Sequence, residues 1–378
     1  MNPFAAISPG RKQLVFLGAN DSFRALAGIY NLKPSSTVAL ADPSPSRWGR
    51  FMNGFIVRNP KSLRLSDDAK VVCLEPMRNW LASDEVNYPA SQKVLSKLQV
   101  KPANIAFVHQ PGRAHRFIAQ NFRIKPEELP GIGRRLIYQD VFQRCNYAYG
   151  LMLASEVGRR MQSPEVSVVE TGVWFGAGLL NICEICDLLT ATQGTRFRIF
   201  GLDTGEGLPE VKDWRDHPEL WATGSMVMPD HDKLRSQLPA NAELILGDVA
   251  TTVPELLRDK IGEKNPIGFL SLDVDLYTAS VNVLKIFDAE AKQLAPVVPV
   301  WVDDSNINIF QGSYCGEALA IREFNECHAT RKIDHKIVRT TRHQTLWHHC
   351  FYFAHIFDSP YRNGFKPGTF ADLFHTDY

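Results

Sequence analysis

The sequence predicts an α/β fold made of two Rossmann-like units. Short apolar runs with strand character alternate with helical patterns in both halves, which is typical of parallel sheets covered by helices. The length of 378 residues fits two domains better than one. A Pro- and Gly-rich stretch, Ile124 to Gly133, lies between the halves. We therefore expect a small α/β domain over residues 1–125, a linker over 126–137 and a second α/β domain over 138–378.

The composition indicates a cytoplasmic protein that binds neither nucleic acid nor membrane. The net charge is only +1, so no strongly basic surface is expected. No apolar run reaches the roughly 18 residues of a membrane helix, and the first residues lack the apolar core of a secretory signal. Seven scattered cysteines argue against a disulfide framework. Cys183 and Cys186 form a C-x-x-C inside a helical pattern, where we favour packing over a metal or redox role.

The first half begins with a strand, a turn and a helix. Leu14–Leu17 is followed by Gly18-Ala19-Asn20 and by a helical pattern from Asp21 to Tyr30. Further strands are predicted over Thr37–Ala41, Val71–Leu74 and Asn104–Val108, and the second strand leads into Asp42. This half loosely resembles the small Rossmann-like domain of sugar O- and N-acyltransferases, which can hold the uridine part of a nucleotide sugar. Nucleotide binding and a degenerate scaffold domain both remain open.

The second half repeats this pattern after a long helical pattern over residues 138–161. The strand Val166–Val169 is followed by Glu170-Thr171-Gly172 and, after two more glycines, by a helix from Leu179. An acid at the strand end and a glycine turn before a helix describe a site for a nucleotide-type ligand. Glycines at such turns can also serve packing alone.

The next two predicted strands also end in acids. Phe197–Leu202 leads into Asp203, which is placed to accept hydrogen bonds from ribose hydroxyls. Ala242–Leu246 leads into Gly247 and Asp248, where a side chain can contact an adenine edge. Either Asp could instead cap a helix or a turn.

Two further strands end in paired acids. Ile267–Leu272 leads into Asp273 and Asp275, and Val297–Val302 leads into Asp303 and Asp304. If the strands are neighbours, four carboxylates meet at one edge and need a compensating cation. Oxygen ligands without nearby His or Cys favour Mg²⁺ or Ca²⁺. One or two of these acids could instead only cap the following loops.

The ordered motifs resemble those of the macrocin-type O-methyltransferases over roughly residues 140 to 355. The resemblance rests on residues 168–174, 201–209, 247–249, 252–254, 273–277, Asp303-Asp304, and 316–318 with Phe324. Members of this family are class I enzymes that move a methyl group from S-adenosylmethionine to sugar hydroxyls of natural products. The resemblance implies a mostly parallel sheet whose last strand is antiparallel, and a sugar-containing small molecule as the acceptor.

The resemblance also implies a role for each site residue. The cofactor would be held by Glu170, Thr171, Gly172, Asp203, Asp248, Val249 and Ser271. Mg²⁺ would be bound by Asp273, Asp303 and Asp304, and Asp275 would be the general base. We also expect a homo-oligomer.

Some features depart from the family or leave alternatives. Ser305 stands where the family has an aromatic residue. A span rich in aromatic and sulfur side chains could form a lid; it contains Trp214, His217, Trp221, Met226, Met228 and His231. Other candidate bases are His343, His348 and His349. Two alternatives remain: a methyltransferase that acts on a non-sugar hydroxyl or an amine, and an inactive scaffold that binds a nucleotide sugar. A dehydrogenase is disfavoured, because the first turn reads E-x-G-x-x-x-G and lacks the G-x-G-x-x-G spacing of dinucleotide-binding turns.

Overall fold

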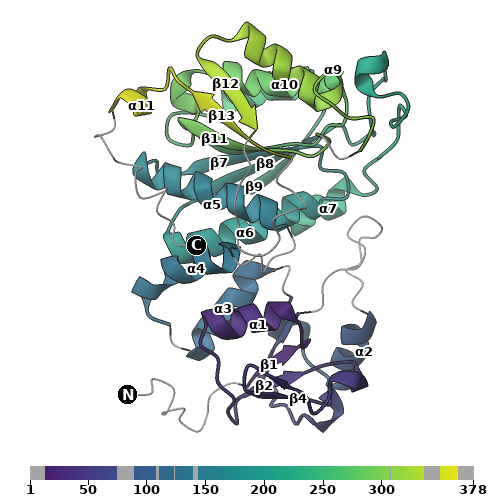
Figure 1. Ribbon diagram of the computed structural model, residues 1–378, viewed down its shortest axis with the longest axis vertical. Helices are drawn as coiled ribbons and strands as arrows, with labels where there is room; N and C mark the ends of the chain where they lie inside the picture. Colours follow the sequence, from purple (N-terminus) through teal and green to yellow (C-terminus); the bar gives the residue numbers. More distant parts are fainter. Residues whose placement is uncertain are drawn as a thin grey trace. The chain divides into compact units, whose positions relative to one another are not determined.

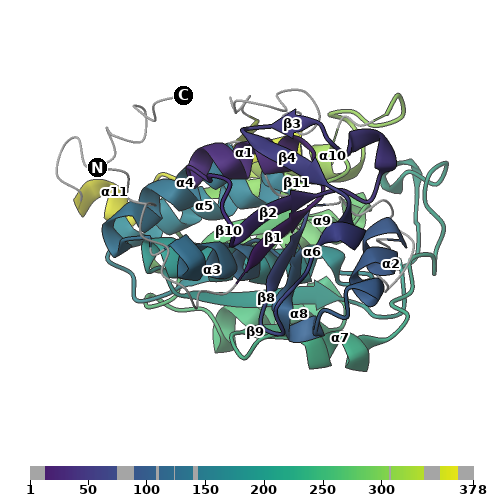
Figure 2. The same ribbon diagram turned by 90° about the horizontal axis from the view of Figure 1, so that it is seen from below.

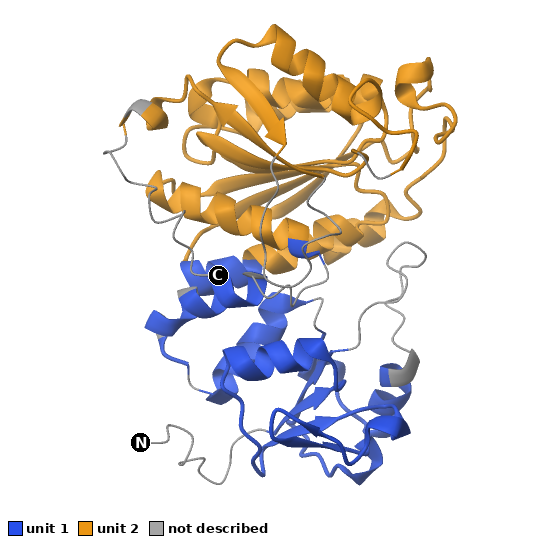
Figure 3. Ribbon diagram, viewed as in Figure 1, with its two compact units in different colours: residues 1–145, 187–193 blue, residues 146–186, 194–378 orange. Residues whose placement is uncertain are grey.

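The chain folds into two compact α/β units in a computed structural model that describes residues 13–74, 89–107, 110–122, 124–138, 144–305, 308–335 and 350–364 (Figure 1). Unit 1 comprises residues 1–145 and 187–193, and unit 2 comprises residues 146–186 and 194–378 (Figure 3). Both sheets are mostly parallel, which confirms the predicted fold class. Among the described helices, none has the length and apolar composition that a membrane crossing requires.

Unit 1 is a six-stranded sheet in the order β3-β4-β2-β1-β5-β6. Its strands are β1 (Leu14–Leu17), β2 (Val38–Ala41), β3 (Phe51–Met52), β4 (Phe55–Arg58), β5 (Lys70–Cys73) and β6 (Ile105–Phe107). Only the pair β3–β4 is antiparallel among these neighbours. Its helices are α1 (Asp21–Ile29), α2 (Pro89–Lys97), α3 (Pro111–Phe122) and α4 (Leu129–Tyr138). Figure 2 shows α1 and α3 on one side of the strands and α2 on the other.

The four strands predicted for the first half are present, with small shifts of their ends. Val108, the last residue of one predicted strand, lies outside the described residues. The prediction missed the hairpin β3–β4, which turns through Asn53 and Gly54 at φ 48° and 82°. Asn-Gly favours such left-handed positions, so the signal for this turn was in the sequence.

The expected linker over residues 126–137 is instead largely helical. A 3₁₀ turn, Pro126–Glu128, leads directly into α4, which begins at Leu129. Pro130 is the second residue of that helix, a position at which the missing N–H of proline breaks no helical hydrogen bond. Gly133 does not interrupt the helix either; a Cβ there would lie 2.6 Å from the Thr192 hydroxyl oxygen, so close packing explains this glycine.

Unit 2 is a seven-stranded sheet in the order β12-β13-β11-β10-β7-β8-β9. Its strands are β7 (Val166–Thr171), β8 (Phe197–Asp203), β9 (Ala242–Leu246), β10 (Ile267–Leu272), β11 (Val297–Val302), β12 (Arg331–His335) and β13 (Phe351–Ile356). The last strand, β13, runs antiparallel to both of its neighbours, as expected. The chain reverses its direction across the sheet at β7, and ligands of open α/β sheets bind at the carboxyl ends of strands at such a point.

Helices cover both faces of this sheet. They are α5 (Cys145–Arg160), α6 (Ala177–Gln193), α7 (His231–Gln237), α8 (Val249–Asp259), α9 (Tyr277–Leu284), α10 (Gly316–Cys327) and α11 (Pro360–Gly364). Figure 1 shows α5 and α6 on one face and α9 and α10 on the other. The central strands β7 and β10 are buried along their whole length, which explains why they read as continuous apolar runs.

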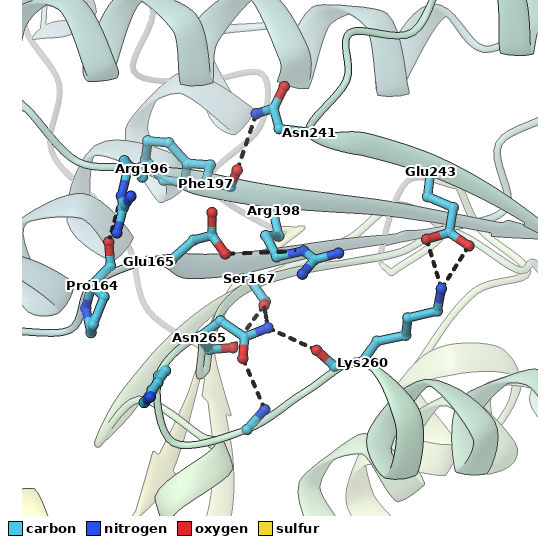
Figure 4. A network of polar contacts seen from close by, with 12 residues as sticks. Pro164, Glu165, Ser167, Arg196, Phe197, Arg198, Asn241, Glu243, Lys260 and Asn265 are labelled. Atoms are coloured by element: carbon cyan, nitrogen blue, oxygen red, sulfur yellow. Dashed lines mark hydrogen bonds and ion pairs between the residues drawn. The ribbon is translucent and has the colours of Figure 1, made fainter.

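Side-chain contacts hold the amino ends of the unit 2 strands together (Figure 4). The hydroxyl of Ser167 in β7 donates to the carbonyl of Asn265, just before β10, at 2.7 Å. The amide of Asn265 in turn donates to Ser167 and to the carbonyl of Lys260. At the next strands, Asn241 donates to the carbonyl of Phe197 at 3.0 Å. These bonds fix the strands relative to one another at the edge opposite to the acidic strand ends.

A buried polar pair in unit 1 predicts that its stability falls in mild acid. The hydroxyl of Tyr30 and Nδ1 of His115 lie 2.6 Å apart, and burial lowers the pKa of His115 to about 4. An unfolded chain with a histidine pKa of about 6.5 binds the proton more readily. Unit 1 should therefore lose up to about 3 kcal/mol as the pH falls from about 6.5 to about 4. Urea unfolding at several pH values measures this loss.

The matched control is His115→Asn, whose side-chain oxygen can still accept the tyrosine hydroxyl but cannot be protonated in this range. That variant should lack this component of the pH dependence. An NMR titration that finds His115 charged at pH 5.5 would contradict the assignment.

Candidate active site

Three carboxylates meet at the carboxyl edge of the unit 2 sheet. Asp273 and Asp275 follow β10, and Asp304 follows the neighbouring parallel strand β11. One oxygen from each lies within 4.8 Å of the others. The register pairs Leu272 with Val302, so the two acidic loops leave the sheet side by side. The predicted meeting of the two acidic strand ends is present in the structure.

Burial and neighbouring charges raise the pKa values of the clustered carboxylates. Burial is the largest cause for Asp273, followed by the charges of Asp303 and Asp275, and its pKa lies well above the ordinary value. Burial likewise raises the pKa of Asp275, and a hydrogen bond to Asp304 is the next cause. Full ionisation of the cluster therefore requires a compensating positive charge. The donor atoms are all hard oxygens, which fit a divalent cation such as Mg²⁺.

Asp275 adopts a left-handed backbone conformation that is uncommon for residues other than glycine. Its φ is 62°, and the N–H of Leu276 donates to the carbonyl of Val274 at 2.5 Å, which closes a tight turn around Asp275. The side chain is 6% exposed. A left-handed non-glycine residue costs about 1 to 3 kcal/mol, and such residues cluster at functional sites. The turn directs Asp275 into the acidic cluster.

Asp303 and Glu317 occupy different positions beside the cluster. Asp303 accepts a hydrogen bond from the indole N–H of Trp301 at 2.7 Å, although its charge still acts on Asp273. Glu317, in the first turn of α10, is fully buried and accepts the backbone N–H groups of Val274 at 3.1 Å and Asp304 at 3.0 Å. Glu317 thus fastens both acidic loops. The sequence prediction assigned it no role, because only the folded chain brings residue 317 to these amides.

The glycine turn after β7 lies directly against the acidic loop. Gly172 has φ 80°, and a Cβ at this position would lie 1.6 Å from the carbonyl oxygen of Asp273. Trp174 and Gly176 continue the turn at φ 47° and 81°. No side chain fits at residue 172 without moving one of the two backbones. The predicted cofactor turn and the predicted metal loop are therefore in backbone contact.

Other predicted cofactor residues form a buried network behind this turn. The hydroxyl of Tyr147 in α5 donates to Glu170 at 3.2 Å and lies 2.9 Å from the Ser271 hydroxyl. The hydroxyl of Thr171 donates to the carbonyl of Ser271 at 2.9 Å. Glu170, Thr171 and Ser271 are each at most 2% exposed. These contacts support the turn from within the sheet.

The acids at the ends of β8 and β9 also contact the backbone. One oxygen of Asp203 accepts the N–H groups of Val173 and Trp174 at 2.7 and 2.9 Å, and the other accepts that of Gly205 at 2.7 Å. Asp248 caps α8 through the N–H of Ala250 at 2.8 Å and is exposed, while Val249 is buried. Asp203 therefore fixes the glycine turn in position.

The aromatic span after Asp203 is partly buried, and its Met226 is half-buried and its His231 exposed. His217 and Met228 are buried, Trp221 packs against the core, and only Trp214 of its tryptophans is exposed. The carboxylate of Asp216 is fully buried within the same span.

Three remaining sequence predictions have different outcomes. Cys183 and Cys186 form no disulfide and are buried in α6, which accords with a packing role. Ser305 is buried, and its hydroxyl donates to the carbonyl of Val302 at 3.2 Å. The alternative bases His343, His348 and His349 lie outside the described residues.

Comparisons with known proteins give distant structural likenesses only. No protein-family model and no curated protein sequence matches the chain. The O-methyltransferase NovP is 17% identical over 56% of this chain and 79% of its own, with a TM-score of 0.40. The calicheamicin methyltransferase CalS11 is 22% identical over 58% of this chain and 83% of its own, with a TM-score of 0.36. An O-methyltransferase from Bacillus cereus is 11% identical over 64% of this chain and 96% of its own, with a TM-score of 0.30.

The contact between Gly172 and Asp273 predicts a large cost for Gly172→Ala. The new Cβ would collide with a backbone carbonyl, which cannot move aside as a flexible side chain can. We expect a loss of at least about 3 kcal/mol of stability, or failure of unit 2 to fold. Urea unfolding monitored by circular dichroism measures this loss.

Gly194→Ala is the matched control. Gly194 also has a positive φ, 77°, but no atom lies within 4 Å of the added Cβ. It should cost only about 1 kcal/mol, the penalty of the left-handed conformation itself. Equal losses in the two variants would show that the contact with Asp273 is unimportant.

Proposed function

We propose that the protein is a metal-dependent O-methyltransferase that moves a methyl group from S-adenosylmethionine to a sugar hydroxyl. One observation carries the proposal: the glycine turn of a nucleotide-type ligand site and a cluster of three carboxylates are in backbone contact at one sheet edge. A methyl donor bound at the glycine turn would therefore lie beside an acceptor hydroxyl bound at the carboxylate cluster. Three of the motifs that resemble the macrocin-type enzymes, residues 168–174, 273–277 and 303–304, lie in these two segments.

The donor is proposed to lie along the carboxyl ends of β7, β8 and β9. The turn around Gly172 lets the ligand approach the backbone closely, and Asp203 and Asp248 flank it at the next two strand ends. Val249 would contact the adenine. Glu170, Thr171 and Ser271 are proposed to hold the turn from behind, since their polar groups face the interior.

The acceptor is proposed to be activated at the acidic cluster. A divalent cation, when bound, would lower the pKa of an acceptor hydroxyl. Asp273 and Asp304 are proposed to hold that cation, with Asp303 as a third ligand if its side chain turns from Trp301. Asp275 is proposed to take the hydroxyl proton, because its strained turn directs its carboxylate into the cluster. The sulfonium methyl donor is already activated, so the enzyme otherwise needs only to align the acceptor oxygen with the methyl group.

A binding experiment tests the donor assignment. S-Adenosylmethionine at about 100 times its dissociation constant should stabilise the native state by about 2.7 kcal/mol. For a domain of this size that corresponds to a rise of about 5 to 10 °C in melting temperature. NAD is the comparison ligand and should leave the transition unchanged, because the turn lacks the dinucleotide spacing. A shift with NAD and none with S-adenosylmethionine would refute the proposal.

A variant of Asp275 tests the division of roles within the acidic cluster. Asp275→Asn keeps the shape of the side chain and tolerates a positive φ, so the turn should survive. If Asp275 is the base, turnover should fall at least about 100-fold, while Mn²⁺, used as a probe for Mg²⁺, should bind as in the wild type. Mass spectrometry of sugar acceptors incubated with enzyme, Mg²⁺ and donor measures the turnover, with EDTA as the metal-free reference.

Two other outcomes assign Asp275 differently. Joint loss of turnover and Mn²⁺ affinity would make Asp275 a metal ligand. Full turnover would remove it from the mechanism. Asp303→Asn provides the complementary measurement, since it should weaken Mn²⁺ binding only if its side chain leaves Trp301.

A further inference from the structure

Helix α9 starts two residues after Asp275, and its first amides require acceptors. The N-cap position is Leu276, whose side chain has no oxygen and makes no capping bond. The exposed amides at a helix start are normally satisfied by a Ser, Thr, Asp or Asn at the cap. An unsupported helix start would leave the strained turn of Asp275 without a fixed neighbour.

The missing acceptor comes from a distant loop. Oδ1 of Asp216 accepts the N–H of Thr278, in the first turn of α9, at 2.9 Å. Oδ2 of the same carboxylate accepts the N–H of Lys212 at 3.0 Å. Asp216 is fully buried, 0% exposed. A carboxylate at this point also interacts favourably with the positive end of the helix dipole.

The residues around Asp216 contact both helices that follow the acidic loops. We call residues 213–217 the clasp. Arg215 lies 4.6 Å from the ring centre of Tyr277, the first residue of α9. The imidazole of His217 packs against Gly316, the first residue of α10, where a Cβ would lie 2.8 Å from Nε2. The clasp therefore touches the helix after Asp275 and the helix after Asp304.

We propose that Asp216 is a positioning residue for Asp275. By replacing the missing cap of α9 it fixes the helix start, and the fixed start holds Asp275 at φ 62° with its carboxylate in the cluster. The role rests on the proposed function, in which Asp275 faces the acceptor hydroxyl. A left-handed residue relaxes once its surroundings no longer determine it, so loss of the cap misaligns the cluster without removing any of its carboxylates.

The test compares Asp216→Ala with Asp216→Asn. The alanine variant should lower kcat about 10- to 100-fold, with KM for the acceptor within about 2-fold of the wild type. It should also weaken Mn²⁺ binding, measured by electron paramagnetic resonance, about 10-fold, as loss of an outer-shell partner does. The asparagine variant should recover part of both losses, since its amide oxygen can accept from Thr278 but its nitrogen cannot accept from Lys212. S-Adenosylmethionine binding should be unchanged in both.

Asp230→Ala is the matched control. Asp230 lies in the same long loop and caps α7 by accepting the N–H of Lys233 at 2.8 Å, but it is exposed. This variant should lower the melting temperature without changing kcat or Mn²⁺ affinity.

Two results would overturn the role of Asp216. One is wild-type kcat and Mn²⁺ affinity in Asp216→Ala. The other is a raised acceptor KM with unchanged kcat, which would make Asp216 an anchor of the loop and nothing more. A wild-type protein that transfers no methyl group would refute the proposed function alone, because the Mn²⁺ affinities of wild type and Asp216→Ala still decide the positioning role.

Discussion

Repulsion between carboxylates is the constraint on which the rest of the unit 2 site depends. Asp273, Asp275 and Asp304 place oxygens within 4.8 Å of one another, in surroundings that raise their pKa values. Such a group drifts apart unless the backbone that carries it is held firmly. Glu317 supplies one hold, because its two oxygens accept one amide from each acidic loop. Burial also raises the pKa of Glu317. Because its two oxygens accept these amides, we assign it to holding the loops in place.

The same constraint reaches the proposed donor site through the backbone. Gly172 lies against the carbonyl of Asp273, so the glycine turn and the acidic loop pack directly on each other. Asp203 holds the turn from its other side by accepting the N–H groups of Val173 and Trp174. In the proposed function this contact places the donor beside the acceptor, and their alignment is the main requirement for transfer from an activated methyl group.

The sequence was sufficient for features that depend on neighbours along the chain. Apolar runs located the central strands, and the acids at or just beyond the carboxyl ends of β7, β8, β9, β10 and β11 could be read directly from the sequence. Features that depend on distant contacts could not be predicted. Glu317 meets Val274 across 43 positions of sequence and Asp216 meets Thr278 across 62. Proline and glycine near residue 130 also misled the prediction, since a proline in the first turn of a helix is tolerated.

Both units use an acid after or at the end of their second strand to hold the first glycine turn, but the two turns differ. In unit 1 Ala19 N–H and Ser44 N–H donate to the two oxygens of Asp42, at 2.7 and 2.8 Å. The two oxygens of Asp203 likewise accept the N–H groups of Val173 and Gly205. The turns differ in length, however: α1 begins at Asp21, three residues after Gly18, whereas α6 begins at Ala177, five residues after Gly172.

In the shorter turn Asn20 caps α1 and donates to the carbonyl of Leu74 at 2.6 Å, so the chain's own side chain bridges the point where a ligand of this fold binds. The longer turn instead gains Trp174 and Gly176 at positive φ, and the carboxylate of Glu170 lies against Gly178 near the start of α6. The Asn20 bridge therefore favours the scaffold interpretation for unit 1.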